Sequence, residues 1–378
     1  MSDTPPTSTT YWDYIRVKEL LALQTGIAAD ESEIATDEVV FITVHQIYEL
    51  WFKLALKDLV AARDLFAKPQ VPDEAMAGAC RKLERLLCIF RLAADHFPLI
   101  ETLTTRDYLE FRDKLFPASG GQSAQFRELE ILFGLDVENI RVPYVTGGSF
   151  EEVLKNPDGS TGWSLQRVQE RMADRPTFRE AIDQWLFRTP IQGSSPANGE
   201  PDTADEARTI AFIDGYLEAH AASVNTLADD ACARVSDAER KTLRGRYETE
   251  IAQASGFLRA EDVPEEERPR RRRIRAAALF IEVYRELPLL AWPRQVLDLI
   301  VAVEQAFVAY RQRHARMAER IIGRRVGTGG SSGVDYLDQV ALAYRIFPDL
   351  WAVRTILVRR DLLPDPDHAE QYGFRFDG

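Results

Sequence analysis

Residues 37–66 read DEVVFITVHQIYELWFKLALKDLVAARDLF, and this stretch decides the fold class. Apolar side chains recur through it at Val40, Val44, Ile47, Trp51, Leu54 and Leu59. The spacing is close to the 3.6-residue period of an α-helix, so the stretch predicts a long amphipathic helix. Such a helix must bury its apolar face against other elements of the fold.

The rest of the chain repeats this pattern. Further helices are predicted at residues 73–97, 101–116, 176–186, 269–287 and 293–323. Pro176 stands near the start of its helix, where proline is tolerated, and Gly323 stands where a helix commonly ends. No stretch shows convincing alternation with a period of two, and no internal repeat is visible. The sequence therefore predicts an all-α fold, a large helical bundle.

The chain of 378 residues is long enough for one large domain or two ordinary ones. Residues 1–10 are rich in Ser, Thr and Pro and predict a flexible tail, while residues 11–378 predict a single all-helical domain. The stretch TPIQGSSPANGEPD at residues 189–202 has the composition of a loop. Residues 203–256 then predict an inserted helical hairpin on the surface of the bundle.

Two capping signals delimit this predicted hairpin. Thr203-x-x-Glu206 and Ser236-x-x-Glu239 both have the spacing of a capping box, which marks the first turn of a helix. We therefore expect one helix to begin at each of them.

Composition and charge narrow the function classes. Hydrophobic residues make up 45% of the chain and the formal net charge is −13, which favours a globular protein with a small-molecule ligand over a nucleic-acid binder. The cysteines Cys80, Cys88 and Cys232 fit no zinc motif, and no C-x-x-C-H haem-attachment motif occurs. The N-terminus resembles no signal peptide and no membrane-spanning segment is expected, so we predict a cytoplasmic protein.

Two of the five histidines lie on apolar helix faces. His45 shares a face with Phe41, Tyr48 and Phe52, and His314 shares one with aromatic and aliphatic residues of the 293–323 helix. An imidazole on such a face can bind haem iron inside a helical bundle. Taken alone, each histidine is better explained as a hydrogen-bonded core residue.

Two further segments have binding chemistry. The loop Gly327-Thr328-Gly329-Gly330-Ser331-Ser332-Gly333 offers backbone N–H groups and hydroxyls to an anion, although it lacks the lysine of a P-loop. By itself it is better read as a linker.

Arg112 lies one turn after Tyr108 and before the segment PASGGQS, so it can clamp a carboxylate beside an aromatic ring. A surface arginine is the alternative.

The run Arg268-Pro269-Arg270-Arg271-Arg272-Arg273-Ile274-Arg275 resembles a nucleic-acid-binding patch. Five acidic residues occur between Glu261 and Glu267, against six arginines in the run. Because the charges nearly balance, the sequence favours a solvated helix start over a nucleic-acid site.

Taken together, these segments resemble the tryptophan 2,3-dioxygenase family. FITVHQIYELWFK at 41–53 resembles the family's distal haem helix, and ETLT at 101–104, Phe111-Arg112 and PASGGQS resemble its substrate-carboxylate region. RVPY at 141–144 follows at a familiar position, and His314 with the 327–333 loop resembles the proximal ligand and substrate loop. The resemblance runs from about Tyr11 to Leu363 and is weakest across 191–260.

The resemblance implies a haem b enzyme, ferrous in its active form, that opens the indole ring of L-tryptophan with O₂ to give N-formylkynurenine. It implies that His314 is the axial iron ligand and that His45 lies on the distal side, facing the indole N–H. The site residues that it implies around these histidines are Arg112 and Thr328 for the amino-acid end, Phe41 and Tyr108 for the indole, and Ser119 and Gly120 for the cofactor.

The resemblance also implies a homotetramer. Tyr11 is expected near the substrate, and Tyr14 and Ile15 match residues that the family inserts into a neighbouring subunit's site. An aromatic motif directly after a polar tail is consistent with such an exchange of N-terminal segments.

Three positions depart from the family pattern. Gly121 stands where phenylalanine is usual, Trp12 where glycine is usual, and Ile15 where leucine is common. The first two change volume in opposite directions, so either Trp12 fills the space beside Gly121 or a larger substrate does. A haem oxygenase acting on a substituted tryptophan or another aromatic is therefore one alternative function. A haem-binding sensor or scaffold without turnover is the other, and the set of amino-acid-binding groups argues against it.

Overall fold

The computed structural model describes residues 9–135, 150–156, 158–196, 202–327, 333–335, 337–338 and 345–373. Throughout these ranges the regular structure is helical, and the β-type pairing they contain is an isolated bridge between Ile191 and Ser194. The predicted all-α class is therefore confirmed. The tail residues 1–8, the RVPY motif and residues 328–332 lie outside the described residues.

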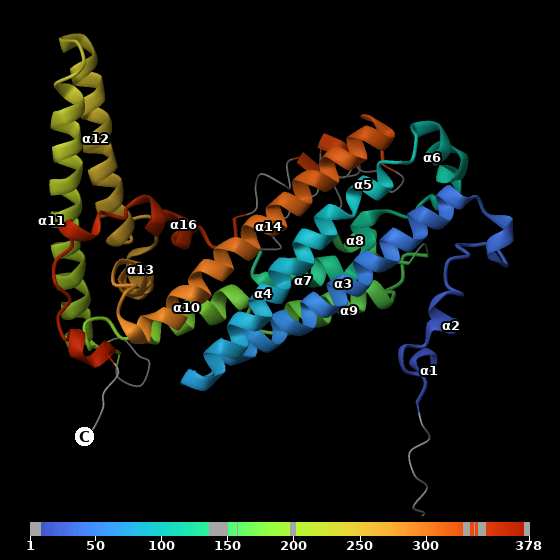
Figure 1. Ribbon diagram of the computed structural model, residues 1–378, viewed down its shortest axis with the longest axis horizontal. Helices are drawn as coiled ribbons and strands as arrows, with labels where there is room; N and C mark the ends of the chain where they lie inside the picture. The colour runs from blue at the N-terminus through green and yellow to red at the C-terminus, as the bar shows by residue number, and fades with distance from the viewer. Residues whose placement is uncertain are drawn as a thin grey trace, which may run out of the picture.

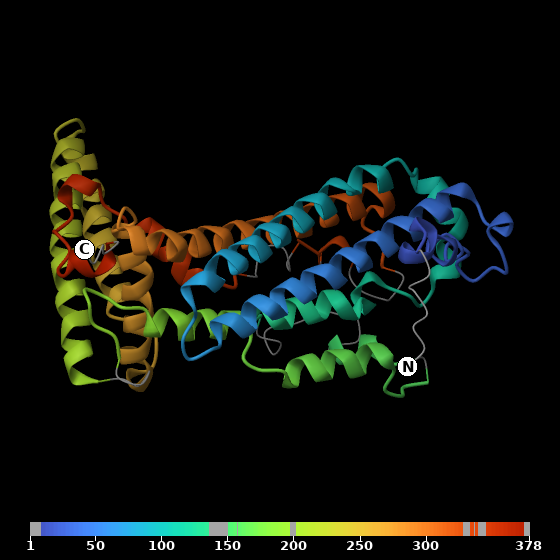
Figure 2. The ribbon, with the colours of Figure 1, turned by 60° about the horizontal axis from the view of Figure 1, so that its bottom comes forward.

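Three long helices form the frame of the molecule. They are α3 (Thr36–Phe66), α4 (Asp73–Asp95) and α14 (Ala291–Ile322), which run side by side (Figures 1 and 2). Their facing residues are fully buried, among them Leu59, Leu83 and Phe90. The apolar period read from residues 37–66 thus packs against two neighbours, which is how an amphipathic helix gains most of its stability.

The other helices are shorter or lie around this frame. Their bounds are α1 (Tyr11–Ile15), α2 (Val17–Leu20), η1 (Glu31–Glu33), α5 (Phe97–Ile100), α6 (Thr105–Arg112), η2 (Asp113–Leu115), η3 (Gly120–Gln122), α7 (Ala124–Phe133), α8 (Phe150–Leu154), α9 (Trp163–Ala173), α10 (Phe178–Arg188), α11 (Thr203–Cys232), α12 (Asp237–Leu258), η6 (Glu265–Glu267), α13 (Arg268–Val283), η7 (Pro288–Leu290), α16 (Pro348–Thr355), η8 (Arg360–Leu362) and η9 (Ala369–Tyr372).

Local capping chemistry explains where these helices depart from the predicted bounds. The predicted helix 101–116 begins only at Thr105, because the Thr104 hydroxyl and the Asp107 carboxylate form a capping box there. The predicted helix 176–186 begins at Phe178 for the same reason, with Thr177 and Glu180 as the pair. At the end of α14, Gly323 is the C-cap residue, as predicted, and its backbone has φ +59°.

The segment 203–256 forms two helices that pack along each other. In Figure 1, α11 and α12 rise together at one end of the molecule, beyond the body of the bundle, and α11 packs on α13 at their base. The Ser236–Glu239 capping box is confirmed, but the predicted box at Thr203 is wrong. Asp202 is the N-cap of α11 and its carboxylate accepts from the Asp205 N–H, because it precedes the first helical residue. That this hairpin is an insertion into a single domain stays a prediction.

The expectation that the arginine run is a solvated helix start is wrong. Arg273 and Arg275 are buried, and Arg273 pairs with the buried Asp205 at 2.7 Å. Arg275 pairs with Asp262 at 2.6 Å and with Asp349 at 3.0 Å. Asp205 and Asp349 lie far from the run in the sequence, so a local count of charges did not reveal them. The run ties α13 to α11 and α16.

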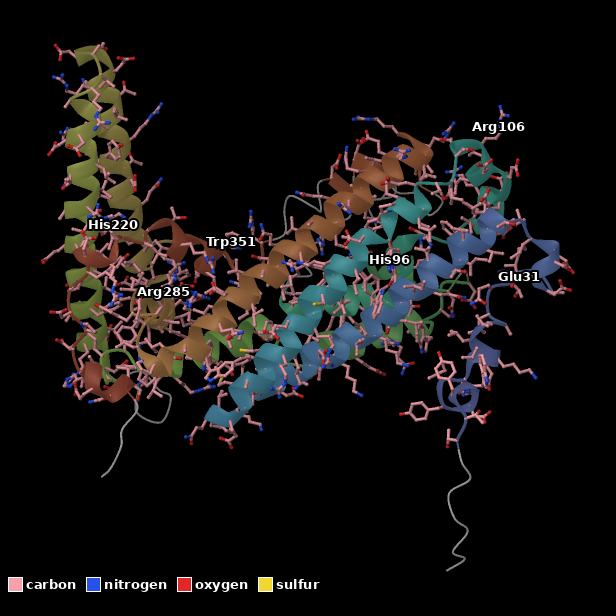
Figure 3. The ribbon with its side chains drawn as sticks, viewed as in Figure 1. Glu31, His96, Arg106, His220, Arg285 and Trp351 are labelled. Carbon is pink, nitrogen blue, oxygen red and sulfur yellow. The ribbon has the colours of Figure 1, made fainter. Side chains whose placement is uncertain are left out.

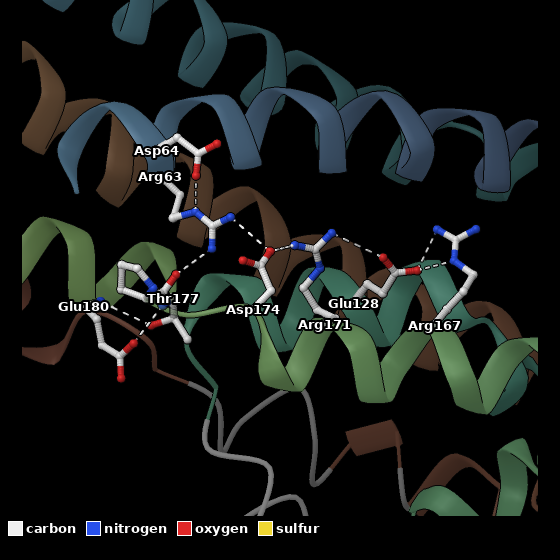
Figure 4. A network of polar contacts seen from close by, with 9 residues as sticks. Arg63, Asp64, Glu128, Arg167, Arg171, Asp174, Thr177 and Glu180 are labelled. Carbon is white, nitrogen blue, oxygen red and sulfur yellow. Dashed lines mark hydrogen bonds and ion pairs between the residues drawn. The ribbon is translucent and has the colours of Figure 1, made fainter. Parts of the chain in front are cut away.

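A second ion-pair network joins α9 to α3 and α7 (Figure 4). The buried Arg63 of α3 donates to the Pro176 carbonyl at 2.7 Å and to Asp174 at 3.0 Å. Arg167 of α9 donates to the buried Glu128 of α7 at 2.6 Å. These contacts fix the side of the bundle opposite α4, leaving the region between α3 and α14 for the cavity described below.

One helix of the described chain, α3, is long and apolar enough to cross a membrane by length and composition alone. It packs against α4, α7 and α10, and one face lines the cavity described below. Part of its apolar surface is therefore buried by the protein itself.

Candidate active site

A cavity of about 880 Å³ lies between α3, α6, α7 and α14. Its walls are mostly aromatic and aliphatic, with charged and polar side chains from α3, α6, α7 and α14 among them. This volume is near the upper end of the range for small-molecule and cofactor sites. Leu20, the last residue of α2, and Leu23, which follows that helix, also line it.

His45 is placed in the cavity wall by α3. Its Nδ1 lies 2.7 Å from the carbonyl oxygen of Phe41, one turn earlier. Because a carbonyl only accepts hydrogen bonds, Nδ1 carries the proton and donates, which leaves Nε2 as an acceptor. Burial lowers the pKa of His45, although the Phe41 carbonyl and the charge of Glu49 oppose this effect. The ring is therefore neutral at pH 7.

His314 lines the same cavity from α14. Its ring is stacked with Phe97, at a centroid distance of 5.7 Å, and with Tyr310, at 6.4 Å. Burial lowers the pKa of His314 to about 4, and the nearby His45 adds to this effect. A neutral imidazole with an available lone pair is the form that binds a metal.

Aromatic rings and one cation surround the His45 side of the cavity. Phe41 lies 6.0 Å from Tyr108 and 5.6 Å from Phe111, measured between ring centroids. Arg112, one turn after Tyr108, also lines the cavity, and its Nη2 donates to the Val326 carbonyl at 2.6 Å. Its buried Nε has no hydrogen-bond partner among the described residues. Two alternatives stood for Arg112, a carboxylate clamp and a surface arginine. Its place in the cavity wall favours the first.

Comparisons with known proteins agree with this geometry. Residues 2–357 match the family model described as tryptophan 2,3-dioxygenase. The chain is 51% identical over 377 residues to a tryptophan 2,3-dioxygenase of Sorangium cellulosum, covering 97% of this chain and 88% of the relative.

The chain belongs to the tryptophan 2,3-dioxygenase family.

Two other relatives extend the match across the family. "Tryptophan 2,3-dioxygenase 2" of Ralstonia nicotianae is 48% identical over 368 residues, covering 96% of this chain and 97% of the relative. "Tryptophan 2,3-dioxygenase B" of Danio rerio is 33% identical over 356 residues, covering 94% and 83%. The resemblance read from the sequence is therefore confirmed.

The family resemblance also implies site residues on the loop before α7, in the 327–333 loop and at the N-terminus. Ser119 and Gly120 line the cavity on the loop before α7, where the Ser119 hydroxyl accepts from the Gly121 N–H at 3.2 Å. A Cβ added at Gly120 would meet nothing within 4 Å, so the side of this loop is open. Thr328 lies outside the described residues.

The N-terminal residues are not brought to the cavity of their own chain. Tyr11, Trp12, Tyr14 and Ile15 are 67%, 64%, 81% and 42% exposed. Helix α1 buries none of its residues, and it stands clear of the body in Figure 1. Within one chain, Trp12 does not lie beside Gly121. Tyr11, Tyr14 and Ile15 do not line the cavity of their own chain either.

The sequence did not identify a charged group at the α7 side of the cavity. Glu130 is completely buried and accepts from Arg127 and Arg311, each at 2.5 Å. All three residues line the cavity. The available signal was the presence of two acids and an arginine within the apolar segment AQFRELEILF of α7, where buried charges must be paired. Pairing with Arg311, however, joins segments 181 residues apart.

Proposed function

We propose that this protein opens the C2–C3 bond of the indole ring of L-tryptophan with O₂ and releases N-formylkynurenine, so that both oxygen atoms enter the product. Membership of the tryptophan 2,3-dioxygenase family supports the reaction. The observation that carries it to this chain is the arrangement of two neutral imidazoles, His45 and His314, in one largely apolar cavity.

The cavity suits haem b as the cofactor. No group of three or more His, Cys, Asp or Glu side chains able to hold a metal is present among the described residues, so a bare ion would lack ligands. A porphyrin brings four ligands of its own and needs one from the protein, for which we propose His314. The buried Tyr48 hydroxyl lines the cavity without a hydrogen-bond partner in the described chain, as expected where a further molecule completes the site. When bound, ferrous haem supplies the redox chemistry that lets O₂ react with the indole.

His45 is proposed to position the indole. Its Nε2 is an acceptor because Nδ1 donates to Phe41, and an indole N–H is a donor only. A neutral indole N–H is a very weak acid, so accepting this hydrogen bond orients the ring without removing the proton. Phe41 and Tyr108 are proposed to wall the indole.

Arg112 is proposed to bind the substrate carboxylate, with Thr328 beside it and near the ammonium group. The guanidinium can form two parallel hydrogen bonds with a carboxylate, and its Nε has no other partner in the described chain. Holding the amino-acid end fixes the distance of the indole from the reacting oxygen, which is a proximity effect. Ser119 and Gly120 are proposed to lie against the cofactor edge.

The assembly is proposed to be a homotetramer in the cytoplasm. The exposed aromatic residues of α1 support an exchange of N-terminal segments, in which Tyr11, Tyr14 and Ile15 reach a neighbouring subunit's site. Residues 11–378 are proposed to form one domain, with the α11–α12 hairpin as an insertion.

An optical experiment tests the proposed function. The protein is loaded with haem, reduced, and mixed with L-tryptophan and O₂. We expect a haem spectrum that responds to tryptophan, followed by oxygen uptake and a product with the absorbance of N-formylkynurenine. A stable haem spectrum with no oxygen uptake would instead identify a haem-binding sensor or scaffold.

A second candidate substrate follows from the open side of the 118–123 loop. With no side chain at Gly120 or Gly121, the cavity has room for a group on the indole ring. Turnover of ring-substituted tryptophans compared with L-tryptophan decides between the two substrates.

A further inference from the structure

The N-terminal segment that runs from the end of α2 towards η1 forms part of the cavity wall. We call residues 20–26 the strap. Leu20 and Leu23 of the strap line the cavity, although the strap precedes α3 and shares no helix with the other lining residues. Leu20 ends α2, but the rest of the strap is irregular backbone, which needs fixed attachment points because no secondary structure of its own holds it in place.

Gln46 of α3 supplies two of these attachment points. Its Nε2 donates to the Leu23 carbonyl at 2.8 Å, and its Oε1 accepts from the Gln24 side chain at 2.7 Å. Gln24 Nε2 also donates to the Leu20 carbonyl at 3.0 Å. Gln46 therefore holds the backbone of the strap directly and, through Gln24, at a second residue one turn earlier.

A third attachment lies at the end of the strap. Gly26 has φ +60°, a left-handed conformation that favours glycine, and a Cβ there would lie 3.2 Å from Cδ1 of Ile42. The backbone thus turns directly against α3, one helical turn before Gln46. On the N-terminal side of the strap, α1 and α2 bury none of their residues, so the strap is the root from which they project (Figure 1).

We propose that Gln46 is a positioning residue for substrate binding, which fixes the strap as one wall of the cavity. Gln46 directly follows His45 on α3, so the residue that would orient the indole and the residue that holds the wall move together. Leu20 and Leu23 are themselves 41% and 60% exposed, so loss of the Gln46 contacts would let them leave the cavity and open it further to water. The inference rests on the proposed function only for the identity of the substrate.

The test uses the haem-loaded full chain and four variants. Gln46→Leu removes both contacts. Gln46→Glu keeps the size and the acceptor for Gln24 but cannot donate to the Leu23 carbonyl, and Gln24→Leu removes the other half. Gln166→Leu, on α9, is the matched control, because Gln166 bonds only to Glu170 of its own helix. Hydrogen–deuterium exchange of residues 17–28 reports the strap, whose amides at Leu20, Leu21, Ala22 and Ala28 are hydrogen-bonded.

We expect both Gln46 variants to speed exchange across residues 17–28 and to raise KM for tryptophan about tenfold, as one or two net hydrogen bonds would do. Gln24→Leu should have a smaller effect and the control none, while kcat and the haem spectrum stay nearly unchanged. Unchanged exchange would overturn the proposal, and so would faster exchange with an unchanged KM. A raised KM without faster exchange would show that Gln46 contacts the substrate itself and would also overturn it. If the native protein fails to oxidise tryptophan, the proposed function fails, while the exchange data still decide whether Gln46 holds the strap.

Discussion

At the scale of single residues, the two cavity histidines differ in the contacts that hold their rings in place. The Nδ1 of His45 donates to the Phe41 carbonyl, whereas the His314 ring stacks against Phe97 and Tyr310. We expect His314→Ala to lose most of the bound haem, and His45→Ala to keep haem and lose part of the activity. Titration of each variant with haem, followed optically, checks this. Retention of haem by His314→Ala and its loss from His45→Ala would reverse the two assignments.

Arg112 gives a second prediction at this scale. Removing one partner of a desolvated, charge-assisted pair costs about 2–5 kcal/mol, so Arg112→Leu should lower kcat/KM for tryptophan by well over tenfold. Tryptamine lacks the carboxylate, so it should be a poor substrate of the native enzyme and lose little more with the variant. Steady-state kinetics with both substrates measure the difference. Equal losses for tryptophan and tryptamine would mean that Arg112 acts on something other than the carboxylate.

At the scale of elements, buried polar groups join helices that are distant in sequence. Glu304 of α14 accepts from the backbone N–H groups of Ile346 and Phe347 and from the Trp351 indole, which fixes the segment leading into α16. Arg273 of α13 pairs with Asp205 of α11, and Arg275 pairs with Asp349 of α16, so these ion pairs join α13 to both helices. Buried charges of this kind are tolerated because each has hydrogen-bonded partners, and removing one partner leaves the other uncompensated.

His220 in the α11–α12 hairpin is less well satisfied and gives a prediction for pH dependence. It is buried on α11, far from Arg106 and Glu31 at the other end of the molecule (Figure 3), and its Nδ1 has no partner in the described chain. Burial lowers its pKa from the ordinary 6.5, although the charge of Glu250 opposes this. As pH falls through 6.5 the unfolded state takes up a proton that the folded state does not, so the free energy of unfolding falls.

We therefore expect His220→Leu to be more stable than the native protein, by a margin that grows as pH is lowered from 8 to 5.5. Urea unfolding of both proteins across this range measures the margin. His96→Leu is the comparison, because the Nδ1 of His96 likewise has no partner in the described chain, but His96 is only partly buried and lies outside the hairpin. A margin for His220→Leu that does not change with pH would show that its charge state does not affect stability.

At the scale of the whole molecule, the position of Trp12 bears on the choice of substrate. The expectation that Trp12 compensates for Gly121 is not met within one chain, because α1 lies away from the cavity. Gly121 lines the cavity, so the volume that a phenylalanine side chain would take there is available either to the substrate or to Trp12 of a neighbouring subunit. We expect the first, so Gly121→Phe should spare L-tryptophan and reject tryptophans with bulky ring substituents.

Kinetics with a series of ring-substituted tryptophans check this prediction. The double variant Gly121→Phe with Trp12→Gly is the control, and it should behave like Gly121→Phe alone. If Gly121→Phe lowers activity towards every indole and Trp12→Gly restores it, a neighbouring subunit's Trp12 fills the space instead.

The sequence by itself determined the helices and the chemistry that they display. The apolar period of residues 37–66, the glycine after residue 322 and the Ser236 capping box are all local signals, and the structure has helices α3, α14 and α12 where these signals place them. His45, Arg112 and His314 were also identifiable, because each is a polar group on an apolar or aromatic face. The family resemblance then implied a role for each of these residues, which the apolar period of the helices alone does not indicate.

The tertiary structure decided which distant charges meet. Glu130 with Arg311, and Arg273 with Asp205, pair across long stretches of chain, and a charge count over a short window misread the arginine run as solvated. The strap beside Gln46 and the exposure of α1 were equally invisible, since both depend on where an irregular segment lies against α3. Helix periodicity is set by neighbours a few residues apart, whereas burial of a charge depends on partners that only the packed fold brings within hydrogen-bonding distance.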